Sequence, residues 1–85
     1  MTLSVDYEQR ARKELHWLPQ ADKLRVHRRI AAYAAEPDST AHDVVPLRGT
    51  PDGYRLRVGD WRVLFRLSAG VMYVRRVVHR REAYR

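Results

Sequence analysis

Residues 54–66 constrain the fold of this chain most, because two alternating runs flank one short glycine-containing pair. Gly59 and Asp60 are the kind of pair that closes a two-residue β-hairpin loop. With that loop, the facing residues are Val58 and Trp61, Arg57 and Arg62, Leu56 and Val63, Arg55 and Leu64, and Tyr54 and Phe65. Partners across a hairpin share a face, so the pairing predicts one apolar, aromatic face and one arginine face.

The predicted arginine face carries Arg55, Arg57, Arg62 and Arg66, interrupted only by Leu64. Like charges directly opposite each other, as Arg57 and Arg62 would be, destabilise a sheet. A pattern that tolerates this repulsion indicates a surface that binds an anion. The 17 Lys and Arg residues against ten Asp and Glu give a charge of +7, and most are arginine, whose planar fork suits phosphate. A basic surface that only faces solvent is the open alternative.

Length and composition bound the other possibilities. Eighty-five residues suffice for one small domain, expected to span residues 1–85, and 45% hydrophobic residues are ordinary for a globular chain. The absence of cysteine excludes a disulfide framework and a thiol nucleophile. His16, His27 and His42 show no ligand spacing with carboxylates, so we expect no metal and no other cofactor. Neither a signal peptide nor a membrane-spanning run is recognisable, which favours a cytoplasmic location without membrane contact.

Two helices are predicted before the hairpin. Asp6, with Gln9 three residues later, has the pattern of an N-cap and capping box, and Pro19 ends the first helix. The second helix is predicted over residues 20–35. Its apolar side would consist of Leu24, His27, Ile30, Ala31 and Ala34. Its basic side would consist of Lys23, Arg25, Arg28 and Arg29, which either faces solvent or contacts RNA phosphates.

A short strand at residues 3–5 and a last strand at residues 71–79 complete the predicted elements. Residues 40–53 contain several proline and glycine breakers and are expected to be irregular, with Leu47 as their apolar anchor. Arg75 and Arg76 break the alternation of the last strand, so its register stays open. The order β-α-α-β-β-β predicts an α+β fold, a small antiparallel-rich β-sheet packed against an N-terminal helical hairpin.

The segments at residues 47–49, 54–65 and 79–84 resemble the RelE/ParE superfamily of bacterial toxins, and the element order extends this resemblance over essentially the whole chain. RelE-like members are the toxins of type II toxin–antitoxin pairs, which cut messenger RNA in the ribosomal A site and leave a 2′,3′-cyclic phosphate. ParE-like members share the fold but poison DNA gyrase. The resemblance thus implies a metal-independent endoribonuclease or, alternatively, a non-enzymatic gyrase poison.

The resemblance also implies which residues would carry the chemistry. The implied catalytic set is Arg55, Arg57, Arg62, Arg80 and Tyr84. We add His79 to this set because histidine is the best proton carrier in the tail, and Arg66 and Arg81 are additional RNA-binding candidates. Cleavage by the neighbouring 2′-OH needs a proton acceptor, stabilisation of the extra phosphate charge and a proton donor. The arginines suit charge stabilisation and stay protonated, so we expect His79 or Tyr84 to handle the proton. His79 could instead be only a structural residue at the strand end.

Either toxin class implies a protein partner. A toxin of charge +7 should attract an acidic, partly disordered antitoxin that covers the arginines and forms a hetero-oligomer with it. The endoribonuclease interpretation adds the ribosome and messenger RNA as partners.

Overall fold

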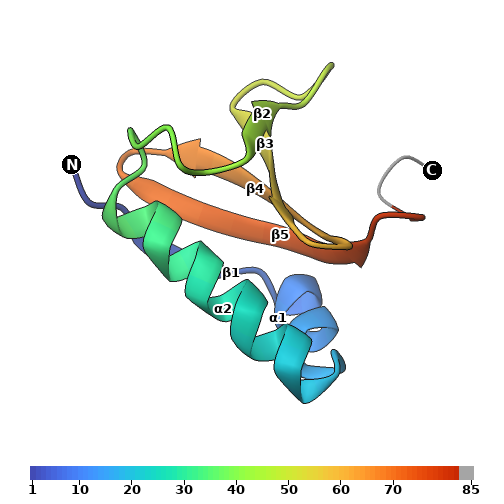
Figure 1. The fold of residues 1–85 in the computed structure, drawn as a ribbon. Helices are drawn as coiled ribbons and strands as arrows, with labels where there is room; N and C mark the ends of the chain where they lie inside the picture. Colours follow the sequence, from blue (N-terminus) through green and yellow to red (C-terminus); the bar gives the residue numbers. More distant parts are fainter. Residues whose placement is uncertain (83–85) are drawn as a thin grey trace.

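The computed structural model describes residues 1–82 as two helices and one five-stranded mixed sheet (Figure 1). The elements are β1 (Ser4–Tyr7), α1 (Gln9–His16), α2 (Gln20–Ala35), β2 (Val44–Pro46), β3 (Gly53–Val58), β4 (Trp61–Ser68) and β5 (Val71–His79). The strands lie in the order β1-β5-β4-β3-β2, with β1 parallel to β5 and the other neighbours antiparallel. This confirms the predicted α+β class but adds one strand, β2.

The hairpin formed by β3 and β4 has the predicted register. Val58 faces Trp61, and the pairing continues without a shift to Tyr54 and Phe65. Gly59 adopts a positive φ of 58°, which the tight turn requires and which glycine adopts without steric cost. The aromatic rings of Tyr54 and Phe65 stack with 5.6 Å between their centroids. Local pattern and turn chemistry therefore sufficed to predict this element.

A β-bulge in β5 settles the register that the sequence left open. Val74 pairs with Phe65 and Arg76 pairs with Leu64, so Arg75 is the additional residue between them. The bulge brings Val77 onto the same face as Met72 and Val74, whereas strict alternation predicted it beside Tyr73. All three of these apolar side chains are buried in the core. The bulge therefore lets β5 keep an apolar face on both sides of an arginine pair.

The predicted N-cap at Asp6 is wrong. Asp6 lies within β1 opposite Tyr73, and helix α1 begins at Gln9 with Glu8 as its N-cap. The strand is longer than predicted because residues 4–7 pair in parallel with β5, and the Glu8 N–H continues the ladder by donating to the Val74 carbonyl at 2.9 Å. A long-range strand pairing has overridden the local capping signal.

Helix α2 spans residues 20–35 as predicted, and Ile30 and Ala34 of the predicted apolar side are buried, but Leu24, His27 and Ala31 are exposed. Leu24 is 45% exposed, whereas the fully enclosed residue of that turn is Val26. The buried residues are Val26, Ile30, Tyr33 and Ala34, which pack with the apolar residues of the sheet. The predicted stripe was rotated around the helix axis because Leu24, His27 and Ile30 also have helical spacing.

Strand β2 occupies the middle of the segment that was expected to be irregular. Val44, Val45 and Pro46 pair antiparallel with β3, which would otherwise be an edge strand. Pro46 is tolerated there because β2 is itself the edge of the sheet and needs no donor on its outer side. Leu47 is half-buried and donates its N–H to the Gly53 carbonyl at 2.9 Å.

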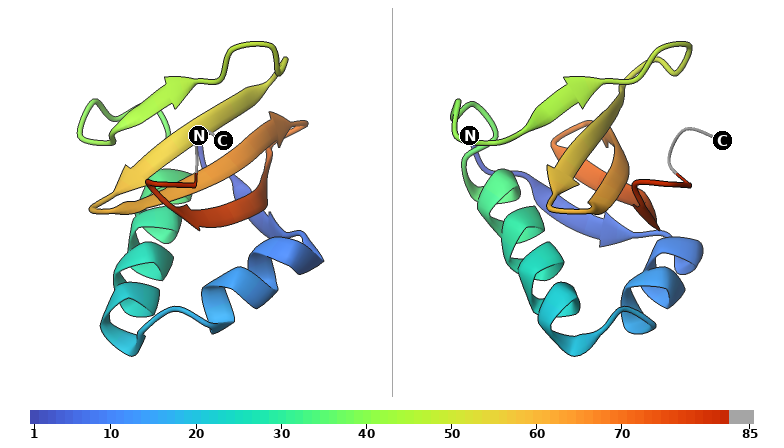
Figure 2. Two further views of the ribbon diagram at one scale, coloured as in Figure 1. Left: turned by 90° about the vertical axis from the view of Figure 1, so that its right-hand side faces the viewer. Right: turned by 45° about the vertical axis from the view of Figure 1, so that its right-hand side comes forward.

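Both helices lie on one side of the twisted sheet and diverge in a V from their short connection (Figure 2). The core fills the space between the helices and the face of the sheet that carries Leu56, Val63 and Phe65. Within residues 1–82, no helix has the length and apolar character needed to span a membrane. Among residues 1–82, no helix lies over the opposite face of the sheet, which carries the predicted arginines (Figure 2).

Candidate nucleic-acid interface

The face of the β3–β4 hairpin opposite the core is hereafter called the arginine face. It is formed by Arg55, Arg57, Arg62 and Arg66, together with Leu64. Strand β5 adds Tyr73, which pairs with Arg66 and lies 4.8 Å from its guanidinium carbon, measured to the ring centroid. This distance is short enough for a cation–π interaction that holds Arg66 against the sheet. The register therefore brings four predicted site residues together on one surface.

Arg57 and Arg62 face each other but have very different environments. The Arg57 side chain is exposed, whereas Arg62 is only 7% exposed. The Arg62 Nη1 donates hydrogen bonds to the carbonyls of Gly59 at 2.8 Å and Trp61 at 3.0 Å. These two carbonyls carry partial negative charge, so they offset part of the repulsion between the facing arginines. The Arg62 Nε is buried, and no partner for it is found among residues 1–82.

Arg80 lies beside the hairpin turn, close to the Gly59 and Trp61 carbonyls that bind Arg62. Its N–H donates to the Asp60 carbonyl at 2.7 Å, which continues the β4–β5 ladder beyond the last strand. Its Nε lies 3.7 Å from a carboxylate oxygen of Asp60, in an ion pair whose partners are both more than half exposed. An ion pair this exposed contributes little stability and can exchange for a phosphate. Asp60 was predicted only as a turn residue, and nothing in its local sequence indicates the contact with Arg80.

His79 does not share the arginine face. It pairs with Trp61, which lies on the same face of β4 as the core residues Val63 and Phe65. The two rings meet edge to face with 5.4 Å between centroids. The His79 Nδ1 accepts a hydrogen bond from the Arg81 N–H at 3.3 Å. The register therefore separates His79 from Arg57 and Arg62 by the thickness of the sheet.

The remaining predicted site residues are Arg81, Tyr84 and Arg55. Arg81 is exposed and contacts His79 through its backbone. Tyr84, predicted as a catalytic residue, lies outside the described residues. Arg55 is half-buried on the arginine face. Among residues 1–82, no three His, Asp or Glu side chains form a group that could hold a metal ion.

Arg75 and Arg76 are paired with carboxylates of α1 and its N-cap, although Arg76 pairs with Leu64 and so lies on the same side of the sheet as the arginine face. Glu14 accepts hydrogen bonds from Arg76 through both carboxylate oxygens, at 2.9 to 3.2 Å, and from the Val77 N–H at 2.9 Å. Glu8 pairs with Arg75 at 3.3 Å. These two carboxylates neutralise the bulge residue Arg75 and the following Arg76, so this part of the sheet is less available to an external anion.

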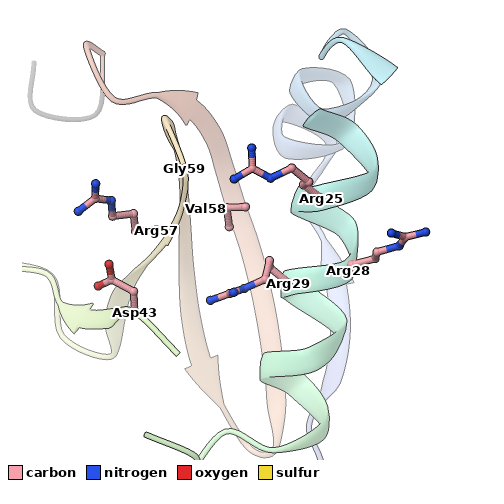
Figure 3. Close-up of a pocket in the computed structure, with 7 residues that line it drawn as sticks. All are labelled: Arg25, Arg28, Arg29, Asp43, Arg57, Val58 and Gly59. Atoms are coloured by element: carbon pink, nitrogen blue, oxygen red, sulfur yellow. The ribbon is translucent and has the colours of Figure 1, made fainter. Parts of the chain in front are cut away.

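The basic residues of α2 lie near the β3–β4 turn, on the side of β3 that faces the helix. Arg25, Arg28 and Arg29 line a hollow beside Gly59, whereas Lys23 is half-buried at the start of the helix. In Figure 3, Arg25 and Arg29 reach toward β3 and Arg28 points away from it. The helix therefore offers two arginines to the hairpin rather than one continuous basic stripe.

Comparison with known proteins identifies the family. Residues 5–84 match the family model described as "ParE toxin of type II toxin–antitoxin system, parDE", which is nearly the entire chain. The chain belongs to the RelE/ParE superfamily of type II toxins. A sequence search of curated proteins finds no relative of this toxin.

Solved structures agree with this assignment. The toxin is similar to a chain of the archaeal RelE–RelB complex from Pyrococcus horikoshii, with 31% identity, a TM-score of 0.79 and coverage of 98% of this chain and 100% of that chain. A RelBE toxin–antitoxin complex from Mycobacterium tuberculosis gives 25% identity, a TM-score of 0.78 and coverage of 93% and 99%. The E. coli DinJ–YafQ complex, at 13% identity with a TM-score of 0.71 over 99% and 100%, shares the fold. The Pyrococcus horikoshii structure is a complex of RelE with RelB, and the Mycobacterium tuberculosis structure is a toxin–antitoxin complex.

Proposed function

We propose that this toxin is a ribosome-dependent endoribonuclease that cuts messenger RNA in the A site by attack of a 2′-OH on the neighbouring phosphorus. The observation that carries the proposal is the clustering of Arg55, Arg57, Arg62 and Arg66 on one sheet face, which neither α1 nor α2 covers. The similarity to toxins of RelE–RelB complexes supports it. It implies a cytoplasmic site of action, and no metal or other cofactor.

The proposed roles follow from exposure and charge. Arg57 is exposed and contacts the scissile phosphate, with Arg55 beside it. Arg80 leaves its exposed partner Asp60 to bind the same or the next phosphate. Arg62 stabilises the extra phosphate charge in the transition state, either directly or by fixing the turn through its two carbonyl contacts. Stabilisation by preorganised donors of this kind contributes most where charge develops during the reaction.

The proposed proton carriers are Tyr84, assigned by resemblance, and His79, assigned by the proton chemistry of histidine. Tyr84 is proposed to stack on a base or to activate the 2′-OH, and stacking on one aromatic ring contributes about 1–3 kcal/mol. His79 is the other proposed proton carrier, but its pairing with Trp61 argues for a structural role. Tyr84→Phe removes only the hydroxyl and Tyr84→Ala removes the ring as well, so comparing them separates the two roles. A pH–rate profile that His79→Ala leaves unchanged would exclude His79 from proton transfer.

Primer extension on a reporter messenger RNA in a purified translation system tests the proposal. We expect wild-type toxin to cut within A-site codons only when ribosomes are present, and Arg57→Ala to lower the cutting rate at least about 100-fold. Arg12→Ala, an exposed substitution on α1 away from the hairpin, is the matched control and should cut normally. Arg62→Ala is compared with Arg62→Lys, because loss of the turn contacts could affect folding.

A gyrase poison is the second candidate, because the matching family model is that of ParE toxins. Well-folded wild-type toxin that cuts no messenger RNA with ribosomes present would contradict the endoribonuclease proposal. A DNA supercoiling assay with purified gyrase then decides whether the arginine face acts on this second target.

A further inference from the structure

A small hollow of about 270 Å³ lies between the end of α1 and the edge of the sheet where β4 begins and β5 ends. We call it the tryptophan hollow, because both tryptophans of the chain line it. Its described lining consists of Glu14, Trp17, Leu18, Trp61, Val77, Val78, His79 and Glu82. These residues come from α1 and its connection to α2, from β4, and from β5 and the turn after it, so only the folded chain brings them together.

The lining of the tryptophan hollow is acidic, although the chain as a whole has a charge of +7. Glu14 and Glu82 line it, and none of its described lining residues is lysine or arginine. The Glu14 charge is balanced by Arg76, whose Nη2 lies 2.9 Å from the carboxylate. Glu82 is exposed and forms no ion pair with any residue in the range 1–82. The hollow therefore has one uncompensated carboxylate, which matches a ligand group with a single positive charge.

The two indole rings give a second, independent reason to expect a cation. Indole is the aromatic group that attracts cations most strongly, because the negative end of its quadrupole lies on the ring faces. Trp17 is 81% exposed, so its ring is available to a ligand. The ring of Trp61 lies 5.4 Å from that of His79 at an interplanar angle of 86°, and Trp17 meets His16 similarly at 5.3 Å and 79°. These contacts restrict both rings, which lowers the entropy cost of ordering them around a ligand.

The apolar part of the lining suits an aliphatic stem. Leu18 and Val77 are buried core residues whose side chains also reach the hollow. A ligand with a short alkyl chain covers this apolar surface while its charged end stays beside Glu82 and the indoles, as the stems of lysine and arginine do elsewhere on proteins. A phosphate or a carboxylate would be repelled by Glu82.

We propose that the tryptophan hollow binds a singly charged organic cation, a guanidinium or alkylammonium group on a short aliphatic stem. Trp17 and Trp61 contact the charged group, Glu82 pairs with it, and the apolar residues contact the stem. A polycation fits less well, because one free carboxylate balances one charge and a chain of charge +7 repels the others. None of the arginines proposed to bind RNA lines this hollow, so the site does not depend on the proposed cleavage activity.

Tryptophan fluorescence of the complete toxin tests this proposal, because all tryptophan emission comes from the hollow. Butylguanidinium is compared with butylurea, which has a similar shape and no charge. We expect butylguanidinium to change the emission in a saturable way and to bind at least about fivefold more tightly than butylurea. A blocked Gly-Gly-Arg-Gly-Gly peptide distinguishes the source of the cation. Tighter binding of the peptide than of butylguanidinium supports a peptide side chain as the ligand, and weaker binding supports a free small molecule.

Two variants separate the contributions of charge and indole. Glu82→Gln should weaken butylguanidinium binding at least about threefold and leave butylurea binding unchanged. Glu36→Gln is the matched control, because it removes one exposed carboxylate at the far end of α2, and it should change binding less than about 1.5-fold. Trp17→Leu keeps an apolar side chain at an exposed position and removes the indole, so it should weaken butylguanidinium binding about threefold, with Trp61 still reporting.

Four outcomes overturn the proposal. Absence of a saturable change would mean that no cation binds, and equal binding of butylurea would mean that the hollow takes any apolar ligand. Equal effects of Glu82→Gln and Glu36→Gln would mean that only the net charge matters. Tighter binding of uridine monophosphate than of butylguanidinium would assign the hollow to a nucleotide. None of these measurements requires RNA cleavage, so they stand whether or not the toxin is an endoribonuclease.

Discussion

Removing the Glu14 carboxylate should destabilise the toxin far more than removing the carboxylate of Glu8, the N-cap residue of α1. Glu14 joins α1 to β5 at the part of β5 that extends beyond its pairing with β1. It accepts hydrogen bonds from the Arg76 guanidinium and from the Val77 N–H, which has no strand partner on that side. In Glu14→Ala, the Arg76 charge and the Val77 donor both lose their acceptor.

The expected cost can be worked from these contacts. Hydrogen bonds to a charged group contribute about 1.5–3 kcal/mol, and a donor left without a partner costs about 1–3 kcal/mol. The side chains of Arg76 and Glu14 are only 31% and 22% exposed, so water replaces these contacts incompletely. We therefore expect Glu14→Ala to lower the free energy of unfolding by about 2–4 kcal/mol. For a domain of this size, that lowers the melting temperature by at least about 8 °C.

Urea unfolding followed by circular dichroism measures this difference, with Glu8→Ala as the matched control. Glu8 also pairs with an arginine of β5, but both side chains are about half exposed, at 51% for Arg75 and 47% for Glu8. We expect this control to lose less than about 1 kcal/mol. Equal losses in the two variants would refute the reasoning. They would mean that the bidentate, partly buried contacts of Glu14 stabilise the toxin no more than the exposed ion pair of Glu8 does.

Three further predictions concern the core, the turns and alkaline pH. Ile30→Ala should lower the free energy of unfolding by about 2–5 kcal/mol and Leu24→Ala by less than about 1 kcal/mol, since only Ile30 is buried; the reverse ranking in urea unfolding would contradict the observed helix face. Gly59→Ala and Gly70→Ala place a Cβ on φ angles of 58° and 78°, so each should cost about 1 kcal/mol in thermal unfolding. Burial, and then the neighbouring Tyr54 and Asp38 charges, raise the pKa of Tyr33 above its usual value of 10.0. Its contribution to stability should therefore be complete below pH 10 and be lost as the pH rises through the higher folded-state pKa, and Tyr33→Phe should reduce that alkaline loss in urea unfolding.

The candidate site was predictable from the sequence only where neighbours in the chain decide the geometry. Arg55, Arg57, Arg62 and Arg66 share a face because the Gly59–Asp60 turn and the period of two determine it. The environment of each arginine was not predictable. Arg80 is paired with Asp60, which is distant in the chain, because the pairing of β4 with β5 brings these groups within reach. The carbonyl partners of Arg62 are close in the chain, but its burial depends on the residues that pack around the turn.

His79 illustrates how a long-range register changes a functional interpretation. As a histidine at the strand end next to Arg80, it was the natural proton carrier, but its position opposite Trp61 directs it to the core side of the sheet. The bulge at Arg75 contributes to this outcome, because an additional residue in β5 reverses the faces of every residue that follows. No local pattern at residues 75–79 indicates whether such a residue is inserted.

Local chemistry alone determined the β3–β4 hairpin, the limits of α2 and the limits of β5, since turn residues, proline and alternation act within a few positions. Tertiary structure alone decided the parallel pairing of β1 with β5, the addition of β2, the buried face of α2 and the bulge. Each of these depends on which distant segment supplies hydrogen-bond partners or apolar surface. That choice is made by the free energy of the whole fold, and a local sequence pattern does not contain it.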